Sequence, residues 1–451
     1  MKLSRKFVSD YIDLPNDDIK TIADKMTSVG NEYDEVGKLI PCTNLIVGKV
    51  LECVMHPDSD HLHVCKVDVG EEILQIVCGA PNAREGIKVI VALPGAVLPG
   101  GTIKKGSIRG VESNGMLCSI AELGLDNKFL SEKDVNGIHE LDDAAVVGED
   151  PIKYLELDDE VIDFELTSNR GDLLSILGMA YELGAIYDKK VKDIDLSHKE
   201  GNDNICDDLT LKVETDSCPL FLARKVKNVT IKESPLFIKN RLIASGIRPI
   251  NNVVDISNYV MLETGQPLHY YDADRLGSTI GVRMAKTQEK LVTLDSVERE
   301  LSDTDIVIFN KEGTVGLAGI MGGLSTEVEN DTKNIVIEAA IFDSVLIRKT
   351  SKKVLRSEAS NRFEKGLDYN RTYMAMERSL HLLQKYADAE VVGGMLEHNT
   401  IEAKDKEIEV TYDKINKVLG IELSKEEILD TFRRLDFEYI DNDDRVIVRV
   451  P

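Results

Sequence analysis

A β-rich segment enclosed by two helical segments is the feature that most constrains how this chain folds. Residues 41–148 break into short apolar runs, among them LIVGKVLECVM, LHVCKVDVG and KVIVALPGAVL, which are separated by Gly/Pro turns. Small closed barrels have this alternation of short strands and tight turns. LPGAVLPGG at 93–101 contains too many turn residues for one continuous strand. We therefore predict a small β-barrel over residues 41–148.

The segments on either side of the barrel have helical spacing. A first helix is predicted between Asp18 and Gly30, with its apolar face formed by Ile19, Ile22, Ala23, Met26 and Val29. After the barrel, NRGDLLSILGMAYELGAIYD predicts a helix capped by Asn169, with a face formed by Leu173, Leu174, Leu177, Ala180, Tyr181 and Gly184. We expect these helices to pack together, so that residues 1–40 plus 149–200 form one small α/β domain interrupted by the barrel.

The remaining residues predict an α+β chain with several domains, as expected for 451 residues. The polar stretch DLSHKEGNDNICDD at 195–208 is interpreted as a linker. Residues 209–400 mix predicted strands and helices in an α/β domain. Residues 401–451 predict a strand and two helices, the second opening with the capping box Ser424–Glu427. The sequence stops within a predicted strand, RVIVRVP, and we expect the natural chain to continue.

Composition excludes some classes of protein and favours others. The sequence contains no run of 18 apolar residues, so no membrane span is predicted. The seven cysteines form no C-x-x-C pair, which is typical of reduced thiols in a cytoplasmic protein. The net charge is −25, yet residues 345–371 carry 8 bases against 3 acids. Such a positive island either attracts a polyanion or is an ordinary solvated helix face.

The stretch HPDSDHLHVC at 56–65 contains several side chains that bind metals in other proteins. Zinc sites need a regular ligand spacing and a second ligand cluster, and none follows in the barrel segment. Pro57 and Asp58 instead predict a turn between strands, with Asp60 bonding backbone amides. His61 and His63 are expected on one face of the following strand. We favour a structural role for this stretch over a metal site.

Polar groups also gather in NNVVDISNYVMLETGQPLH, which contains Asn251, Asn252, Asp255, Asn258 and His269. Because buried amides need hydrogen-bond partners, this segment is either a polar turn network or the wall of a binding pocket.

Two later segments are informative as well. GLAGIMGG at 316–323 matches neither dinucleotide-binding nor P-loop spacing, and its glycines allow close approach of the backbone. Glu338 lies within the apolar run NIVIEAAIFD, where a carboxylate is either a paired structural group or a ligand-binding residue.

These segments resemble successive blocks of the bacterial phenylalanyl-tRNA synthetase β-subunit family. The barrel segment is similar to its tRNA-binding OB-fold module, and LTSNRGDLLSILGMAYELGAI to the block that follows. Four later segments of this chain resemble blocks of the family's B3/B4 editing domain: GIRPINNVVDISNYVMLETGQPLHYYDADRL, GLAGIMGG, VIEAAIFD and LRSEASNRFEKGLD. The departures are small: Phe7 stands where Trp is usual, Ser357 where some members have Thr, and Glu358 where some have Asp.

The resemblance implies four units. An OB-fold barrel (41–148) is inserted in the N-terminal domain (1–40 plus 149–200), and the B3/B4 editing domain (209–400) follows. The start of a helix-turn-helix-like B5 domain, truncated here, covers 401–451.

The resemblance also implies roles for residues of an editing site. His269 and Asn258 would position the ester and the attacking water, and Gly322 would lie against the bound amino acid. Glu338 would bind the hydroxyl of a tyrosine ring, while Ser357 and Ala359 would shape the pocket. No metal ligand is expected in this portion, since the family's magnesium ligands would lie beyond residue 451.

By the same resemblance, the intact enzyme attaches phenylalanine to its tRNA with ATP and Mg²⁺, with the chemistry on the α subunit of an α₂β₂ heterotetramer. This portion alone is not expected to aminoacylate but to hydrolyse mischarged tyrosyl-tRNA. The alternative is a non-catalytic RNA- or protein-binding adaptor that uses the barrel and the last helices. A DNA partner is not expected, because residues 401–450 carry 14 acids against 9 bases.

Overall fold

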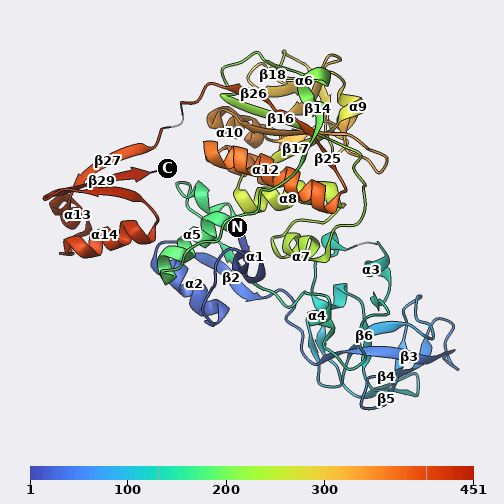
Figure 1. The fold of residues 1–451 in the computed structure, drawn as a ribbon. Helices are drawn as coiled ribbons and strands as arrows, with labels where there is room; N and C mark the ends of the chain where they lie inside the picture. Colours follow the sequence, from blue (N-terminus) through green and yellow to red (C-terminus); the bar gives the residue numbers. More distant parts are fainter. Residues whose placement is uncertain (131, 403, 451) are drawn as a thin grey trace.

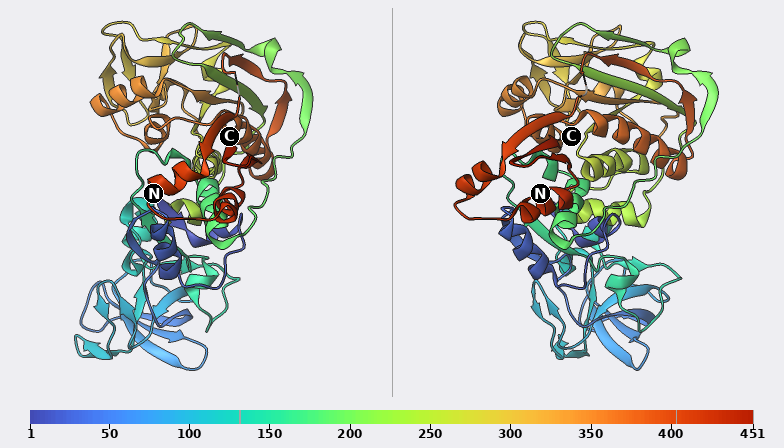
Figure 2. Two further views of the ribbon diagram at one scale, coloured as in Figure 1. Left: turned by 90° about the vertical axis from the view of Figure 1, so that its left-hand side faces the viewer. Right: turned by 60° about the vertical axis from the view of Figure 1, so that its left-hand side comes forward.

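A computed structural model describes residues 1–130, 132–402 and 404–450. Figures 1 and 2 show an elongated molecule with the barrel at one end, the larger α/β unit at the other and the N-terminal elements between them. The α+β fold class with several domains is confirmed.

The N-terminal unit is a three-stranded sheet built from both sides of the barrel segment. Its strand order is β1-β13-β2, all antiparallel, so that the strand following the barrel lies between two strands that precede it. The elements are β1 (Lys2–Ser4), α1 (Arg5–Ser9), α2 (Ile19–Ser28), β2 (Tyr33–Lys38), α4 (Pro151–Tyr154), β13 (Glu160–Phe164) and α5 (Ile176–Tyr187). The barrel is thus an insertion between paired strands.

Helix α2 begins and ends as predicted. Asp18 caps it by accepting a hydrogen bond from the Thr21 amide, and Gly30 follows with φ +96°. The predicted cap of α5 is wrong, because Ser175, and not Asn169, accepts from the amide of Gly178. Residues Gly171–Leu173 form a short 3₁₀ turn instead.

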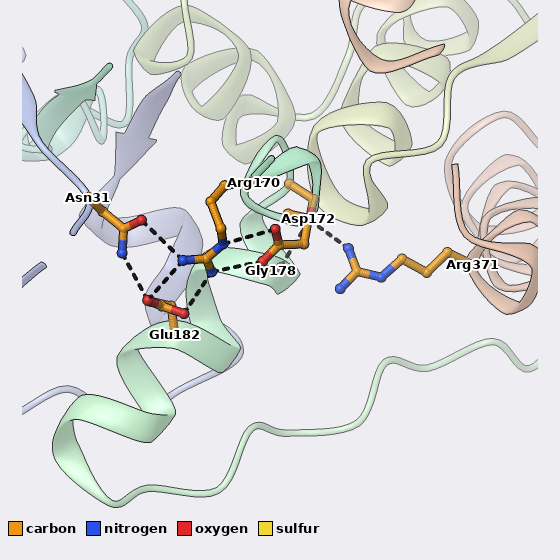
Figure 3. Close-up of polar contacts among 7 residues, drawn as sticks. Asn31, Arg170, Asp172, Gly178, Glu182 and Arg371 are labelled. Atoms are coloured by element: carbon orange, nitrogen blue, oxygen red, sulfur yellow. Dashed lines mark hydrogen bonds and ion pairs between the residues drawn. The ribbon is translucent and has the colours of Figure 1, made fainter. Parts of the chain in front are cut away.

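A polar network holds this turn against the rest of the N-terminal unit. The guanidinium of Arg170 donates to Asp172 and Glu182 and to the amide oxygen of Asn31 (Figure 3). From α12 (Tyr369–Tyr386), Arg371 donates to the Ser175 hydroxyl at 2.8 Å. The start of α5 is therefore tied to the larger α/β unit.

The barrel sheet has the order β11-β6-β3-β4-β5, with β12 paired to β6. Its strands are β3 (Leu45–Met55), β4 (His63–Asp68), β5 (Ile73–Cys78), β6 (Lys88–Ala92), β11 (Met116–Cys118) and β12 (Glu140–Leu141). Two ribbons pair β7 (Val97–Leu98) with β8 (Gly101–Thr102) and β9 (Gly106–Ile108) with β10 (Val111–Ser113), and α3 spans Glu132–Asn136. The Asn114 amide donates to Gln75 of β5, which brings the ends of the sheet together.

The larger unit stacks two sheets. The first has the order β14-β25-β16-β24-β17, with β26 beside β16; the second has the order β15-β18-β21-β22-β23. The first sheet comprises β14 (Glu200–Asn204), β16 (Leu220–Lys227), β17 (Leu268–Asp272), β24 (Ile335–Ile341), β25 (Glu390–Gly393) and β26 (Leu396–Asn399). The second comprises β15 (Thr210–Val213), β18 (Thr279–Met284), β21 (Ile306–Phe309), β22 (Thr314–Leu317) and β23 (Met321–Gly322), with the hairpin β19 (Lys290–Val292) and β20 (Glu298–Glu300) beside it.

Helices cover the face of the first sheet that points away from the second. Figure 1 shows α8 and α12 along this face. The helices of the unit are α6 (Ile205–Asp208), α7 (Leu236–Ala244), α8 (Asn252–Thr264), α9 (Ala273–Leu276), α10 (Ser344–Lys353), α11 (Glu358–Phe363) and α12. The predicted linker at 195–208 is wrong in part, because β14 pairs parallel with β25 and α6 follows it.

The last unit has the predicted strand and two helices. It comprises β27 (Lys406–Thr411), α13 (Tyr412–Leu419), α14 (Lys425–Arg434), β28 (Glu438–Asp441) and β29 (Arg445–Val450), with strand order β27-β29-β28. The predicted capping box of Ser424 and Glu427 opens α14 and is confirmed. Arg433 joins this unit to Asp188 at 2.9 Å. Among the described residues, no helix is long and apolar enough to cross a membrane.

Candidate functional site

A cavity of about 70 Å³ lies between the two sheets of the larger unit. The first sheet contributes β17 and β24, the second contributes β21, β22 and β23, and α11 closes one side. Most of the wall is apolar or backbone. The polar side chains among its lining residues are those of His269, Tyr271 and Glu338.

Strand pairing places these three side chains together. In the antiparallel register of β17 and β24, His269 lies directly opposite Glu338. Tyr271 is two residues further along β17 and therefore on the same face as His269. Directly opposed residues on a sheet have Cβ atoms about 5 Å apart, and an aromatic side chain also reaches the diagonal neighbour. The Tyr271 hydroxyl accordingly donates to Oε2 of Glu338.

Glu338 is a buried carboxyl with capacity for a further hydrogen bond. Its exposed fraction is 6%, and burial raises its pKa from 4.5 to about 7, an effect that the Tyr271 hydroxyl partly offsets. Within the described part of the chain, Oε2 is bonded and Oε1 has no recorded hydrogen bond. A carboxyl that lines a small, mostly apolar cavity and keeps one oxygen without a hydrogen bond is suited to accept a hydroxyl from a ligand.

The imidazole of His269 is neutral at physiological pH. Burial lowers its pKa to about 4, and its ring lies edge-on to the Tyr271 ring with centroids 4.4 Å apart. Its ring nitrogens make no hydrogen bond to any described residue. A neutral imidazole offers one donor and one acceptor, and both remain available here.

Position 322 must be glycine, because the His269 ring lies against its backbone. A Cβ atom at this position would lie 2.2 Å from Cε1 and 2.4 Å from Nε2 of His269. Gly319 is similarly close to Phe363, with φ +66°. The glycines of GLAGIMGG therefore let the second sheet approach the polar group of the first, in agreement with the predicted close backbone approach.

The structure brings together only some of the predicted site residues. His269, Gly322, Glu338 and Ala359 line the cavity, whereas Asn258 and Ser357 are absent from its described lining. Ser357 lies behind the wall, where its hydroxyl donates to the carbonyl of Ile320 and caps α11. Sequence reasoning missed Tyr271. The two adjacent tyrosines of β17 were only a weak indication that one of them lies in the site.

Most of the amides predicted around 251–258 support the fold. Asn251 caps α8, and the side chain of Asn252 bonds the backbone of Thr230, Lys232 and Tyr386. Asp255 accepts from the Ser234 hydroxyl and the Ile250 amide. The polar turn network, which was the alternative interpretation, is therefore the correct one for Asn251, Asn252 and Asp255.

The histidine-rich stretch is engaged within the barrel. Nδ1 of His56 accepts from the amide of Asp58, and its Nε2 contacts the Ile108 carbonyl oxygen at 3.1 Å. Asp60 contacts the ring of His61. The expectation that His61 and His63 share a strand face is wrong, because β4 begins at His63. In the described residues, no group of three His, Cys, Asp or Glu side chains has the arrangement of a metal site.

A larger hollow of about 630 Å³ opens on the barrel, lined by β5, the β9–β10 ribbon, β11 and α3. Its lining residues include Cys78, Lys104, Ser113 and Glu122. Glu122 is held by the amide and hydroxyl of Ser119. This wide hollow is suited to binding an extended ligand.

Family models match three parts of the chain: a tRNA binding domain at residues 45–150, a B3/4 domain at 217–388, and a tRNA synthetase B5 domain at 408–451. The phenylalanine–tRNA ligase β subunits of Staphylococcus aureus (strain bovine RF122 / ET3-1) and Geobacillus kaustophilus (strain HTA426) are each 45% identical to it, covering 100% of this chain and 57% of the relative. The chain thus spans a little over half the length of these relatives.

A solved structure also aligns with part of the chain. A crystal structure of an N-terminal fragment of the phenylalanyl-tRNA synthetase β subunit from Pyrococcus horikoshii aligns with 65% of this chain and 82% of that chain. The sequence identity is 18% and the TM-score is 0.32.

Gly322→Ala is expected to displace the His269 ring and to lower the free energy of unfolding by about 1–3 kcal/mol, because the added methyl group overpacks the cavity. Chemical denaturation and the imidazole NMR signals of His269 measure both effects. Gly316→Ala is the matched control, since its Cβ would meet no atom nearer than 3.7 Å. Equal losses of stability in the two variants would contradict the steric explanation.

Tyr271→Phe is expected to raise the pKa of Glu338 further, because it removes the donor that stabilises the carboxylate. Tyr270→Phe is the control: its hydroxyl bonds Ser379 at 2.6 Å on the other face of β17. Each variant should lose about 1 kcal/mol of stability, but only the first should move the Glu338 titration. NMR titration of labelled glutamate measures it, and an unchanged Glu338 pKa in Tyr271→Phe would refute the assignment.

Proposed function

We propose that this chain, a relative of the phenylalanine–tRNA ligase β subunits along its whole length, hydrolyses tyrosine wrongly attached to phenylalanine tRNA. The reaction would take place in the cavity between the two sheets, within the matched B3/4 domain. The observation that carries the proposal is Glu338, a buried carboxyl that faces the cavity beside His269 and has one oxygen available.

A second site of this kind has a physical reason. Tyrosine differs from phenylalanine by one hydroxyl, and an apolar pocket rejects an added hydroxyl by only about 10². A site built around that hydroxyl discriminates in the opposite direction by about 10⁴–10⁵, because phenylalanine leaves the buried acceptor unpaired. A carboxylate in an apolar cavity meets this requirement.

Each cavity residue then has a role in the proposed reaction. Glu338 accepts the phenol hydroxyl through Oε1, while Tyr271 holds Oε2. Gly322 and Ala359, which have little or no side chain, leave room for the ring of the bound tyrosine. Neutral His269 positions the ester carbonyl or the attacking water through its ring nitrogens.

The remaining predicted residues have more distant roles. Ser357 keeps Ile320 in place from behind the wall. Asn258 was predicted to position the ester and the attacking water, but it is not among the residues that line the cavity in the described chain. No residue is proposed as a covalent nucleophile.

The positive island lies beside the cavity, and we propose that it receives the end of a tRNA. Arg348, Lys349 and Lys352 of α10 and Arg356 are exposed, and within the described chain their side chains have no recorded partner. The segment leads directly to Ala359 in the cavity wall. Unpaired cations beside the cavity would hold the phosphates of the acceptor end of a tRNA.

The activity of the whole enzyme extends beyond these residues. In the intact protein an α subunit would carry out the ATP- and Mg²⁺-dependent attachment of phenylalanine, with α and β chains in an α₂β₂ assembly in the cytoplasm. The portion described here would contribute editing and tRNA binding.

Glu338→Gln is expected to reduce the preference for tyrosyl-tRNA over phenylalanyl-tRNA by about 10- to 100-fold, because a hydrogen bond to a charged acceptor is lost. In the unaltered chain this preference should rise with pH through about 7, as the carboxyl ionises. The variant should show no such rise. Deacylation rates of the two aminoacyl-tRNAs between pH 6 and pH 8 measure both effects.

Stability provides an independent check on the ionisation of Glu338. Its raised pKa means that the folded state binds the proton more tightly, so its contribution to stability is present below pH 4.5 and is lost as pH rises through about 7. Glu338→Gln should remove this loss. If the stability profile changes as expected but selectivity does not, Glu338 is buried and neutral as described but does not bind tyrosine.

Reversing two charges of the positive island, Lys349→Glu with Lys352→Glu, is expected to weaken binding of phenylalanine tRNA about tenfold or more at low salt and to make its salt dependence shallower. Lys414→Glu with Lys417→Glu on α13 is the matched control, with the same spacing, exposure and charge change. Filter binding at several salt concentrations measures both. A stronger effect of the α13 pair would instead favour an adaptor that binds RNA through its last helices.

The adaptor is the second candidate because the hollow on the barrel, within the matched tRNA binding domain, offers a wide binding surface. An adaptor would protect both aminoacyl-tRNAs or neither, whereas an editing enzyme releases tyrosine selectively.

A further inference from the structure

Two thiols face each other across the hairpin that encloses the histidine-rich stretch. Cys53 of β3 and Cys65 of β4 are directly opposed in the antiparallel register, and their sulfur atoms lie 3.6 Å apart. Both are free thiols. This part of the motif has no role in the proposed function.

The hydrogen-bond pattern makes this the closer kind of cross-strand pair. The amide of His56 donates to the carbonyl of Leu62, so these two residues form a hydrogen-bonded pair. Bonded and non-bonded pairs alternate along antiparallel strands, and the Cα atoms of non-bonded pairs are about 4.5 Å apart. Counting back three pairs places Cys53 and Cys65 in a non-bonded pair, within the Cα separations that disulfides span.

The two thiols differ in their access to solvent. Cys65 is fully buried on the central strand β4, whereas Cys53 is half-buried. β6 pairs only with Leu45–Lys49 of β3, so the end of β3 that contains Cys53 has β4 as its sole neighbour in the described sheet. A small oxidant therefore reaches Cys53 first.

We propose that the pair is a reversible oxidation site that forms a disulfide when the protein is exposed to hydrogen peroxide. The Cys53 sulfur, as thiolate, attacks a peroxide oxygen; the O–O bond breaks, and water leaves once the released hydroxide takes up a proton. The Cys65 sulfur then attacks the resulting sulfenic acid, forming the S–S bond and releasing a second water. Two thiols are oxidised and one molecule of hydrogen peroxide is reduced to two of water, and a dithiol reductant reverses the change.

The disulfide closes a loop that weaker contacts already shape. Within it, His56 accepts from the Asp58 amide, and Arg109 of the adjacent ribbon donates to the Asp58 carbonyl at 2.8 Å. A covalent bond across the hairpin, close to its turn, restricts its unfolded states and therefore stabilises the barrel. Cys78 on β5 is the nearest competitor, but its register partner is His63 and not a thiol.

The experiment uses the full chain, treated with a small excess of hydrogen peroxide, alkylated, and digested without reductant. Trypsin leaves both thiols in one peptide, Val50–Lys66, because no Lys or Arg lies between them. We expect this peptide to be unalkylated and lighter by two hydrogen atoms. Further cleavage at Asp58 and Asp60 should leave two cysteine-containing pieces that separate only after reduction. The oxidised protein should melt at a higher temperature until dithiothreitol is added.

Variants establish which thiols react. Cys53→Ser should abolish the linked peptide and the rise in melting temperature, whereas Cys78→Ser, in the same barrel core, should retain both. Because Cys53 is half-buried, its serine variant is expected to fold even if a Cys65 variant does not. A disulfide from Cys65 to Cys78, or a Cys53 oxidised to sulfinic acid with Cys65 still alkylated, would overturn the proposal.

Discussion

The antiparallel pairing of β17 with β24 is the constraint on which the candidate site depends. It sets His269 directly opposite Glu338 and brings Tyr271 within reach of the same carboxyl. On the other face of these strands, Tyr270 and Ile337 pack into the core beneath the helices. A shift of one residue would exchange the two faces and place the carboxyl among those apolar side chains. Packing in the core therefore fixes the register, and the register sets the geometry of the site.

The N-terminal unit shares that core. Phe7 of α1 stacks on Tyr259 of α8 with ring centroids 4.6 Å apart. Close by, Tyr11 donates to the buried carboxylate of Glu263, which also receives two hydrogen bonds from Arg378. Truncating one partner of such a buried ion pair is costly, by about 3–5 kcal/mol, because the other charge is left uncompensated. The contacts make the N-terminal unit and the cavity-bearing unit one packed body, while the barrel extends from it.

The sequence predicted the elements better than the contacts of the site. Periodicity and caps located α2, α14 and the barrel strands, because these signals are local. The cap of α5 was misplaced because it depends on a tight contact, in which a Cβ on Gly178 would lie 1.9 Å from the Asp172 carbonyl oxygen. Glu338 stood out as a charge in an apolar strand. Its partner Tyr271 did not, since the two residues are 67 apart in sequence and their strands must pair before the contact exists.

The opposite pKa shifts of the two cavity residues follow from the same burial. Burial disfavours charge, so it raises the pKa of Glu338 to about 7 and lowers that of His269 to about 4. Between these values both groups are neutral. As pH falls from 6.5 to about 4, the lowered pKa of His269 reduces the stability of the fold. As pH falls from about 7 to 4.5, the raised pKa of Glu338 increases it. The two effects therefore oppose each other. The cavity first acquires a charge when Glu338 ionises near neutral pH, and that carboxylate is the form that best accepts a phenol hydroxyl.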